Sequence, residues 1–152
     1  MDEEDRPIWV VEFGKWNVRK TIEEGPRSQE LLEKYIDQMA LNALNSMNFT
    51  ADPDTTPQII SIVDLEGFNY RQLASPQSLS FILKKFAFFS QAISKYVSVA
   101  YMVNTNFVAE TMINLLRPVL GEALSRFEVH GTNKAKWMPK LAQKLPKDQI
   151  PE

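Results

Sequence analysis

The sequence predicts an α/β fold, in which a mixed, mainly parallel sheet of about five strands is flanked by helices. Strand-like and helix-like segments alternate along the chain, as they do in folds whose strands are joined by helical crossovers. The segment Ile59–Asp64 is apolar except at Ser61 and its last residue, which is typical of a central strand covered on both faces. The chain has 152 residues and is 44% hydrophobic, which is sufficient for one domain that buries about 70% of its unfolded surface.

The first half of the chain contains two predicted strands and one long helix. Residues 8–13 are β-branched and aromatic and predict the first strand. Apolar residues then recur at helical spacing over residues 29–47, and Ser28 is the expected N-cap. Residues 50–57 include two prolines and two aspartates, so they predict a surface loop. The buried strand 59–64 follows this loop.

The second half repeats the alternation. Ser75 and Pro76 supply the N-cap and the first residue of another predicted helix. Residues 97–105 read as a strand, residues 106–120 as an apolar helix, and residues 126–130 as a strand with one apolar and one polar face. Because no repeat, low-complexity tract or linker divides the chain, we expect one domain over residues 1–152.

The helix over residues 106–120 has an unusually wide apolar surface. At about 100° per residue, its apolar side chains form a continuous arc roughly 160° wide. The arc contains Val108, Met112, Ile113, Leu115, Leu116, Val119 and Leu120. A stripe of this width predicts either packing on a broad sheet or closure over something apolar, and ordinary core packing is the more common cause.

Composition excludes several classes of function. The 17 basic and 19 acidic residues nearly balance, so no global field favours a nucleic-acid partner. The chain has no cysteine, one histidine and five dispersed glycines, which leaves no thiolate or histidine-rich metal site and no phosphate-binding glycine loop. We therefore expect no cofactor and no metal. The N-terminus is acidic and no apolar run approaches about 18 residues, so we expect a cytoplasmic protein.

Three polar features are candidates for chemistry. Asp64 and Glu66 follow a central strand and form a possible carboxylate pair, but their Asp-Leu-Glu-Gly context favours a turn. His130 lies on the polar face of a strand without a nucleophile motif, so we expect a structural role and no catalytic residue. A lysine-rich C-terminal segment suits either an anionic lipid surface or a solvated helix face; its members are Lys134, Lys136, Lys140, Lys144 and Lys147.

The order of several motifs resembles the CRAL-TRIO lipid-binding family, which includes retinaldehyde and tocopherol transfer proteins and the yeast phosphatidylinositol transfer protein. The resemblance begins at Arg6 and runs through RPIWVVEFGKW, DLEG, YMVNT, NLLRPVLG and KLPKDQIPE. Its most specific parts are the turn at residues 64–67, Asn104 at the end of a strand, and the pair Arg117-Pro118.

The resemblance implies an apolar pocket with the sheet as its floor and a mobile gate helix, from about Phe107 to Val119, as its lid. It implies the following pocket residues: Ile59, Ser61, Val63, Ala100, Met102, Phe127 and Val129 from strands, and Phe107, Ile113 and Leu116 from the gate. Arg126 is the implied headgroup contact. The expected function is to bind one hydrophobic ligand and transfer or present it between membranes, as a monomer with transient, peripheral membrane contact. The alternative is a non-transferring interaction module whose pocket is filled by Phe86, Phe88 and Phe89.

The chain also departs from the family pattern. It has Ser94-Lys95-Tyr96 where phosphoinositide-handling members carry a Pro-Glu-Arg-like motif, and Ile59 replaces one of two hydroxyls used for choline headgroups. From the resemblance we expect the helical N-terminal domain of the family to be absent, and the C-terminal end to be truncated at residue 152, where relatives continue into a Gly-rich turn. We therefore expect a shortened chain with some uncovered apolar surface. An Ile113→Asp change is expected to abolish ligand retention while sparing the fold.

Overall fold

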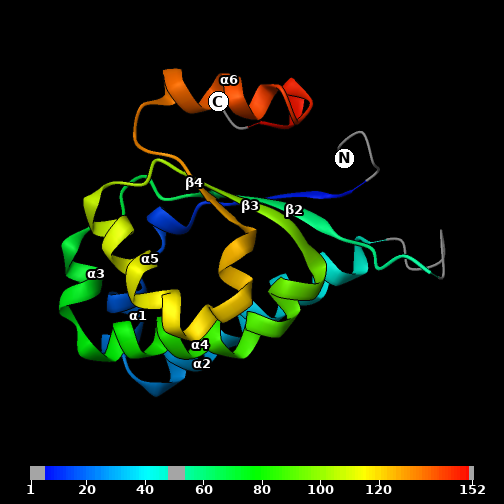
Figure 1. The fold of residues 1–152 in the computed structure, drawn as a ribbon. Helices are drawn as coiled ribbons and strands as arrows, with labels where there is room; N and C mark the ends of the chain where they lie inside the picture. Colours follow the sequence, from blue (N-terminus) through cyan, green and yellow to red (C-terminus); the bar gives the residue numbers. More distant parts are fainter. Residues whose placement is uncertain (1–5, 48–53, 151–152) are drawn as a thin grey trace.

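The computed structural model describes residues 6–47 and 54–150 and contains one sheet with helices on both faces (Figure 1). Short 3-10 helices are labelled η. In chain order the elements are β1 (Ile8–Val11), η1 (Phe13–Lys15), α1 (Val18–Glu23), α2 (Pro26–Asn45), β2 (Ile59–Asp64), α3 (Tyr70–Ala74), α4 (Pro76–Tyr96), β3 (Val97–Val103), α5 (Phe107–Leu120), η2 (Gly121–Arg126), β4 (Phe127–Val129), α6 (Lys134–Ala142) and η3 (Lys147–Gln149).

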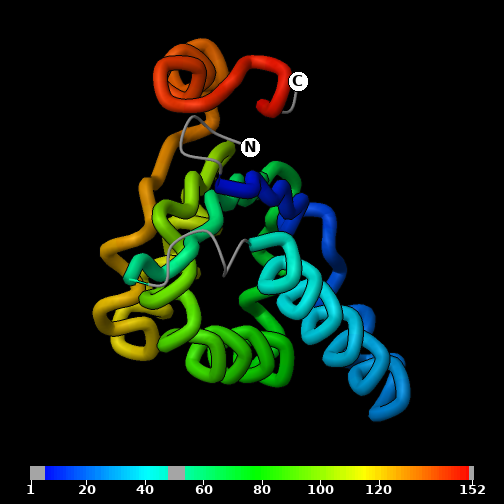
Figure 2. The backbone as a smooth tube through the Cα atoms, turned by 90° about the vertical axis from the view of Figure 1, so that its right-hand side faces the viewer, coloured from blue at the N-terminus to red at the C-terminus, as the bar shows by residue number. Residues whose placement is uncertain are grey.

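The sheet has the strand order β1-β2-β3-β4, and every pairing between its strands is parallel. Neighbouring parallel strands are joined by crossover connections, which are almost always right-handed. When each new strand is added at the same edge of the sheet, right-handed crossovers place all the connecting helices on the same face. Accordingly α1 to α5 lie on one side of the sheet and α6 lies on the other (Figures 1 and 2). The predicted α/β class is confirmed, with four strands in the described residues where about five were expected.

Strand alternation divides the interior into two clusters. On β2, Ile60 and Ile62 face α6 and pack with Trp137 and Leu141. The intervening positions face the α1 to α5 layer, whose cluster includes Met102 of β3 and much of α5. Strand β2 is therefore covered on both faces, as its largely apolar sequence predicts.

Helix starts follow their capping residues. Ser75 Oγ accepts a hydrogen bond from Ser78 N–H at 3.3 Å at the start of α4, as the sequence predicts. The long helix α2 begins at Pro26 instead of after Ser28. Its N-cap is Gly25, whose φ of 115° few other residues adopt, and proline suits the first helical position because it needs no hydrogen-bond partner there.

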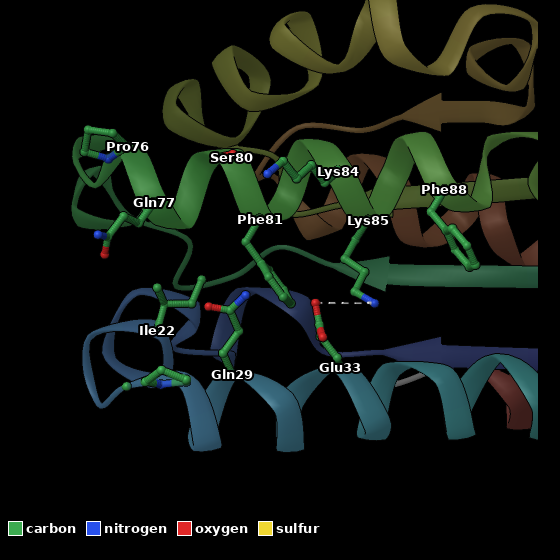
Figure 3. A pocket seen from close by; sticks show the side chains of 12 residues that line it. Ile22, Gln29, Glu33, Pro76, Gln77, Ser80, Phe81, Lys84, Lys85 and Phe88 are labelled. Carbon is green, nitrogen blue, oxygen red and sulfur yellow. Dashed lines mark ion pairs between the residues drawn. The ribbon is translucent and has the colours of Figure 1, made fainter.

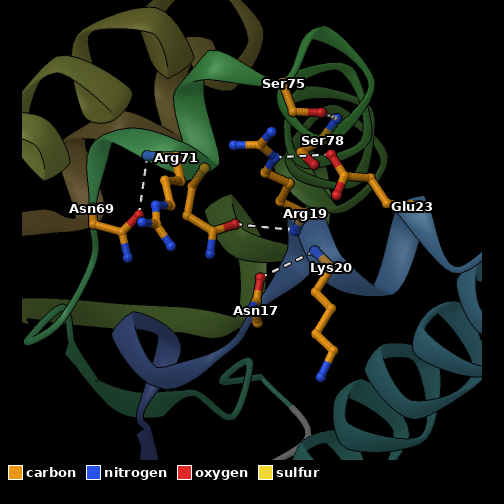
Figure 4. A network of polar contacts seen from close by, with 9 residues as sticks. Asn17, Arg19, Lys20, Glu23, Asn69, Arg71, Ser75 and Ser78 are labelled. Atoms are coloured by element: carbon orange, nitrogen blue, oxygen red, sulfur yellow. Dashed lines mark hydrogen bonds and ion pairs between the residues drawn. The ribbon is translucent and has the colours of Figure 1, made fainter.

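Short helices that the sequence did not predict are joined by a polar network (Figure 4). The buried side chain of Gln72 on α3 accepts from Arg19 N–H at 3.2 Å and donates to Trp16 O at 3.3 Å. Asn17 caps α1 through the N–H of Lys20. These bonds fix α1 against α3 and thereby set where the chain enters α2. Of the predicted loop 50–57, residues 50–53 lie outside the described residues.

The carboxyl ends of β2 and β3 are also fixed by side chains. Asp64 Oδ1 accepts hydrogen bonds from Glu66 N–H at 2.9 Å and from Asn104 Nδ2 at 3.0 Å. Asn104 has a φ of 56° and its Oδ1 accepts from the indole of Trp137 at 3.3 Å. The Asp64 carboxylate is therefore used to hold a turn, which agrees with the turn interpretation of this motif. Gly14 packs so closely on this turn that a Cβ would lie 2.1 Å from Glu66 O.

Candidate functional site

An apolar cavity of about 310 Å³ lies between the sheet and the helices α2 and α4. Its floor is the face of β1, β2 and β3 opposite α6, and its walls are the inner sides of the two long helices. Both helices lie on the same side of the sheet in Figure 2. Ser61 and Lys85 are among its few polar lining residues. Such a space suits a hydrocarbon better than a polar metabolite.

The pattern of strand residues accounts for the floor. Residues two apart on a strand share a face, so Ile59, Ser61 and Val63 point together into the cavity. The neighbouring strand β3 contributes Ala100 and Met102. Ala100 is in register with Phe127 of β4, which also lines the cavity. The structure thus brings together six of the ten residues that the resemblance implied: Ile59, Ser61, Val63, Ala100, Met102 and Phe127.

The other four implied residues lie elsewhere. Ile113 and Leu116 are buried within the core cluster and are not part of the cavity wall. Phe107, at the start of α5, is 82% exposed, and Val129, at the end of β4, is 48% exposed. The contribution of α5 to the cavity is Met112, which directly precedes Ile113 and lies about one turn before Leu116.

Helix α5 is firmly packed. Five of its residues are buried: Ala109, Met112, Ile113, Leu116 and Leu120. Its first turn is capped by Asn106, which accepts from Ala109 N–H and donates to Phe68 O, both at 2.8 Å. Lifting the whole helix would expose four large apolar side chains at about 1.5–3 kcal/mol each, a cost similar to the total stability of a domain. That α5 moves as a gate stays a prediction.

The helix α2 supplies cavity residues that sequence reasoning did not assign. They are Ile36, Met39, Ala40, Ala43 and Leu44, which share its inner face. Helical periodicity identified this apolar face but not what it faces. Two aromatic residues of α4, Phe86 and Phe89, line the wall without filling the space, and Phe88 points away with 75% of its surface exposed.

Comparison with known families agrees with this architecture. A model of the CRAL/TRIO domain matches residues 1–152. The chain belongs to the CRAL/TRIO domain family. A search of curated proteins gave no match to it. Members of this family bind or transfer lipids, so the apolar cavity of this CRAL/TRIO domain is its candidate lipid site.

The implied headgroup residue of this CRAL/TRIO domain has a structural contact. Arg126, at the end of η2, donates from its guanidinium to the carbonyl oxygen of Ser94 at 3.0 Å. That bond ties η2 to the last turn of α4, and Arg126 is not among the residues that line the cavity.

The remaining polar candidates are held in local pairs. His130 is buried, and its ring Nε2 lies 3.0 Å from Glu128 Oε1. The backbone N–H of His130 donates to Met102 O at 2.8 Å. Lys144 approaches the other oxygen of Glu128 at 3.6 Å. Among the described residues, no three acidic or histidine side chains are grouped as a metal site would need. No helix within residues 6–47 and 54–150 is long and apolar enough to cross a membrane.

Proposed function

We propose that this CRAL/TRIO domain holds one hydrophobic ligand in the cavity between the sheet, α2 and α4, and carries or presents it between membranes. The observation that carries the proposal is the apolar cavity of about 310 Å³, lined almost wholly by hydrocarbon. Its volume is at the lower end of the range for small-molecule sites, which favours one acyl or isoprenoid chain over a whole two-chain phospholipid.

The physical basis of the proposed function is transfer without passage through water. Moving one methylene group of a ligand from water into an apolar environment is favourable by about 0.8 kcal/mol. The apolar cavity can therefore replace the contacts that a lipid loses when it leaves a bilayer. No covalent step is required, and we propose a monomeric carrier that contacts membranes transiently from the cytoplasm. The ion pairs and hydrogen bonds around Arg126 and His130 then serve the fold.

Native mass spectrometry of the purified protein, followed by extraction and identification of bound molecules, tests this proposal. We expect one lipid or isoprenoid per chain, or stoichiometric uptake of a labelled lipid from vesicles by the empty protein. A protein that is folded, empty and unable to take up lipid would contradict the proposal. That result would favour the alternative function, an interaction module that binds a protein or a membrane surface without transfer.

A further inference from the structure

The cavity is lined by apolar residue types that differ from those of an ordinary protein core. Four of the six methionines of the chain line it, whereas only one of the 14 leucines does. Leucine is the usual filler of a core, because it packs in few defined rotamers, and methionine fills the gaps. The four methionines are Met39 on α2, Met47 just after it, Met102 on β3 and Met112 on α5, and the leucine is Leu44. Thioether groups therefore reach the cavity from its floor and from its helical walls.

Aromatic rings form much of the remaining lining. Half of the 16 aromatic residues of the chain line the cavity. They are Trp9, Phe13, Trp16, Phe81, Phe86, Phe89, Tyr96 and Phe127. Among the described residues, the rings of Trp9, Phe86 and Phe127 have no ring partner. A ligand that stacks against these three rings therefore breaks no existing ring pair.

A second hollow of the molecule has a different lining. It is a depression of about 890 Å³ between the N-terminal halves of α2 and α4 (Figure 3). No methionine is among the described residues that line it, and its two aromatic residues are Phe81 and Phe88. In Figure 3 they are accompanied by polar side chains, among them Gln29, Glu33 and Lys84. The concentration of sulfur and aromatic groups is thus a property of the cavity and not of the space between these helices in general.

Sulfur and aromatic groups favour one kind of apolar ligand over another. A thioether is polarisable and makes favourable contacts with π-systems at a distance of about 5 Å, and aromatic rings attract other π-systems in offset or edge-to-face arrangements. A saturated chain gains from burial alone, and leucine would supply that gain equally well. Methionine also has three rotatable bonds, so it adapts to a rigid ligand without movement of the backbone.

The methionines combine fixed and adaptable positions. Met102 and Met112 are fully buried members of the core cluster, so the protein orders them before a ligand binds. Such preorganisation lowers the entropic cost of binding. Met39 is half-buried on α2, where its side chain has more freedom to adjust. The cavity therefore presents a fixed sulfur surface near the sheet and an adaptable one on the opposite wall.

We propose that Met39, Met47, Met102 and Met112 determine the specificity of the cavity, and that they select a ligand whose apolar part is a conjugated, unsaturated chain over a saturated chain of the same length. This inference rests on the proposed function, because selection has a role only if the cavity takes up ligand. It narrows the class of ligand and is independent of which element opens the cavity.

The test compares the affinities of the full chain for two uncharged ligands of equal length. They are the methyl ester of parinaric acid, which has four conjugated double bonds, and methyl stearate, its saturated counterpart. Trp9 and Trp16 line the cavity, so energy transfer from tryptophan to the tetraene reports binding of the first ester, and loss of the transfer reports displacement by the second. We expect the wild type to prefer the unsaturated ester by about tenfold. Because the ratio of the two affinities is compared between variants, differences in solubility between the esters cancel.

Substitution of methionine by leucine removes the sulfur at nearly constant volume, so the fold should be retained. The double variant Met102→Leu/Met112→Leu is expected to reduce the preference to about threefold, and Met39→Leu alone to about fivefold. The reverse change, Leu44→Met, adds a thioether to the lining and should raise the preference by about twofold. The matched control is Met138→Leu on α6, which packs on the other face of the sheet and should leave the preference unchanged.

Melting temperatures show whether each variant is folded, and if the double variant is not, Met39→Leu and Leu44→Met decide the result. Equal affinity of the wild type for the two esters would overturn the inference and leave the proposed function standing. The same conclusion would follow from a preference that the methionine-to-leucine variants retain in full. If the folded wild type binds neither ester, the proposed function fails, and the inferred selectivity fails with it.

Discussion

Filling the cavity from the side of α2 is the most direct test of what the cavity does. Ala43 lies on the inner face of α2 and lines the cavity together with Ala40 and Leu44. Leucine forms helices nearly as well as alanine, so the substitution Ala43→Leu leaves the propensity of α2 almost unchanged. Its effect therefore comes from three additional carbon atoms placed in the apolar space.

The expected magnitude follows from burial. Three methylene-sized groups at about 0.8 kcal/mol each give at most about 2.4 kcal/mol of additional stability in the empty protein. For a domain of this size, that corresponds to a rise in melting temperature of about 5–10 °C. The same groups occupy space that a ligand would use, so a chain that fills the cavity should lose the same free energy, about 50-fold in affinity.

The assay is thermal unfolding with and without a series of labelled alcohols of increasing chain length. Ala43→Leu should raise the melting temperature of the empty protein and lower the longest chain length that still stabilises it. The control is Ala87→Leu, the same change at an exposed position of α4 that does not line the cavity. A destabilised Ala43→Leu protein, or one with an unchanged preference for chain length, would refute the assignment of this space to ligand.

Three further predictions concern the fold around the site. Ser78 Oγ is buried without a hydrogen-bond partner among the described residues. Ser78→Ala should therefore leave the free energy of unfolding in urea unchanged or raise it by about 1 kcal/mol. A decrease in this free energy by more than about 1 kcal/mol would reveal a hydrogen-bond partner of the Ser78 hydroxyl. Gly14→Ala should cost about 3 kcal/mol or prevent folding, because its Cβ would meet backbone at 2.1 Å, whereas Gly131→Ala, with open space around it, should melt within a degree or two of the wild type. Arg126→Gln should lower stability by about 1 kcal/mol and leave affinity for anionic lipid unchanged; reduced affinity at unchanged stability would instead support a headgroup role.

Much of the sheet could be predicted because strand patterns are local. The apolar run of β2 indicates a strand covered on both faces, and the structure has one cluster on each side of it. Ser75 followed by Pro76 predicts the start of α4 correctly, because a cap and a first-turn proline act within a few residues. Which face of each strand meets the cavity came from the resemblance, since periodicity cannot distinguish two apolar faces.

The parts that could not be predicted depend on distant contacts. The six residues of α1 are fixed by Gln72, which is 53 positions from its partner Arg19. Arg126 lies at the end of η2, but its long side chain reaches the carbonyl of Ser94, and no local pattern specifies that bond. The expectation that Ile113→Asp spares the fold is also affected: Ile113 packs in the core, where an unpaired charge is expected to destabilise the protein.

The wide apolar stripe of α5 is explained by its packing against several neighbouring elements. Helix α5 lies against α3, α4 and η2, and its cluster includes Met102 of the sheet, so a wide arc is buried without any ligand. On α2, apolar side chains occur on both sides: one set lines the cavity, and Leu31, Tyr35 and Leu41 are exposed. An apolar stripe shows that a surface avoids water, but it does not show whether the neighbour that covers it is fixed. Burial decides between the two cases for α5, because five of its residues are buried among neighbouring elements of the core.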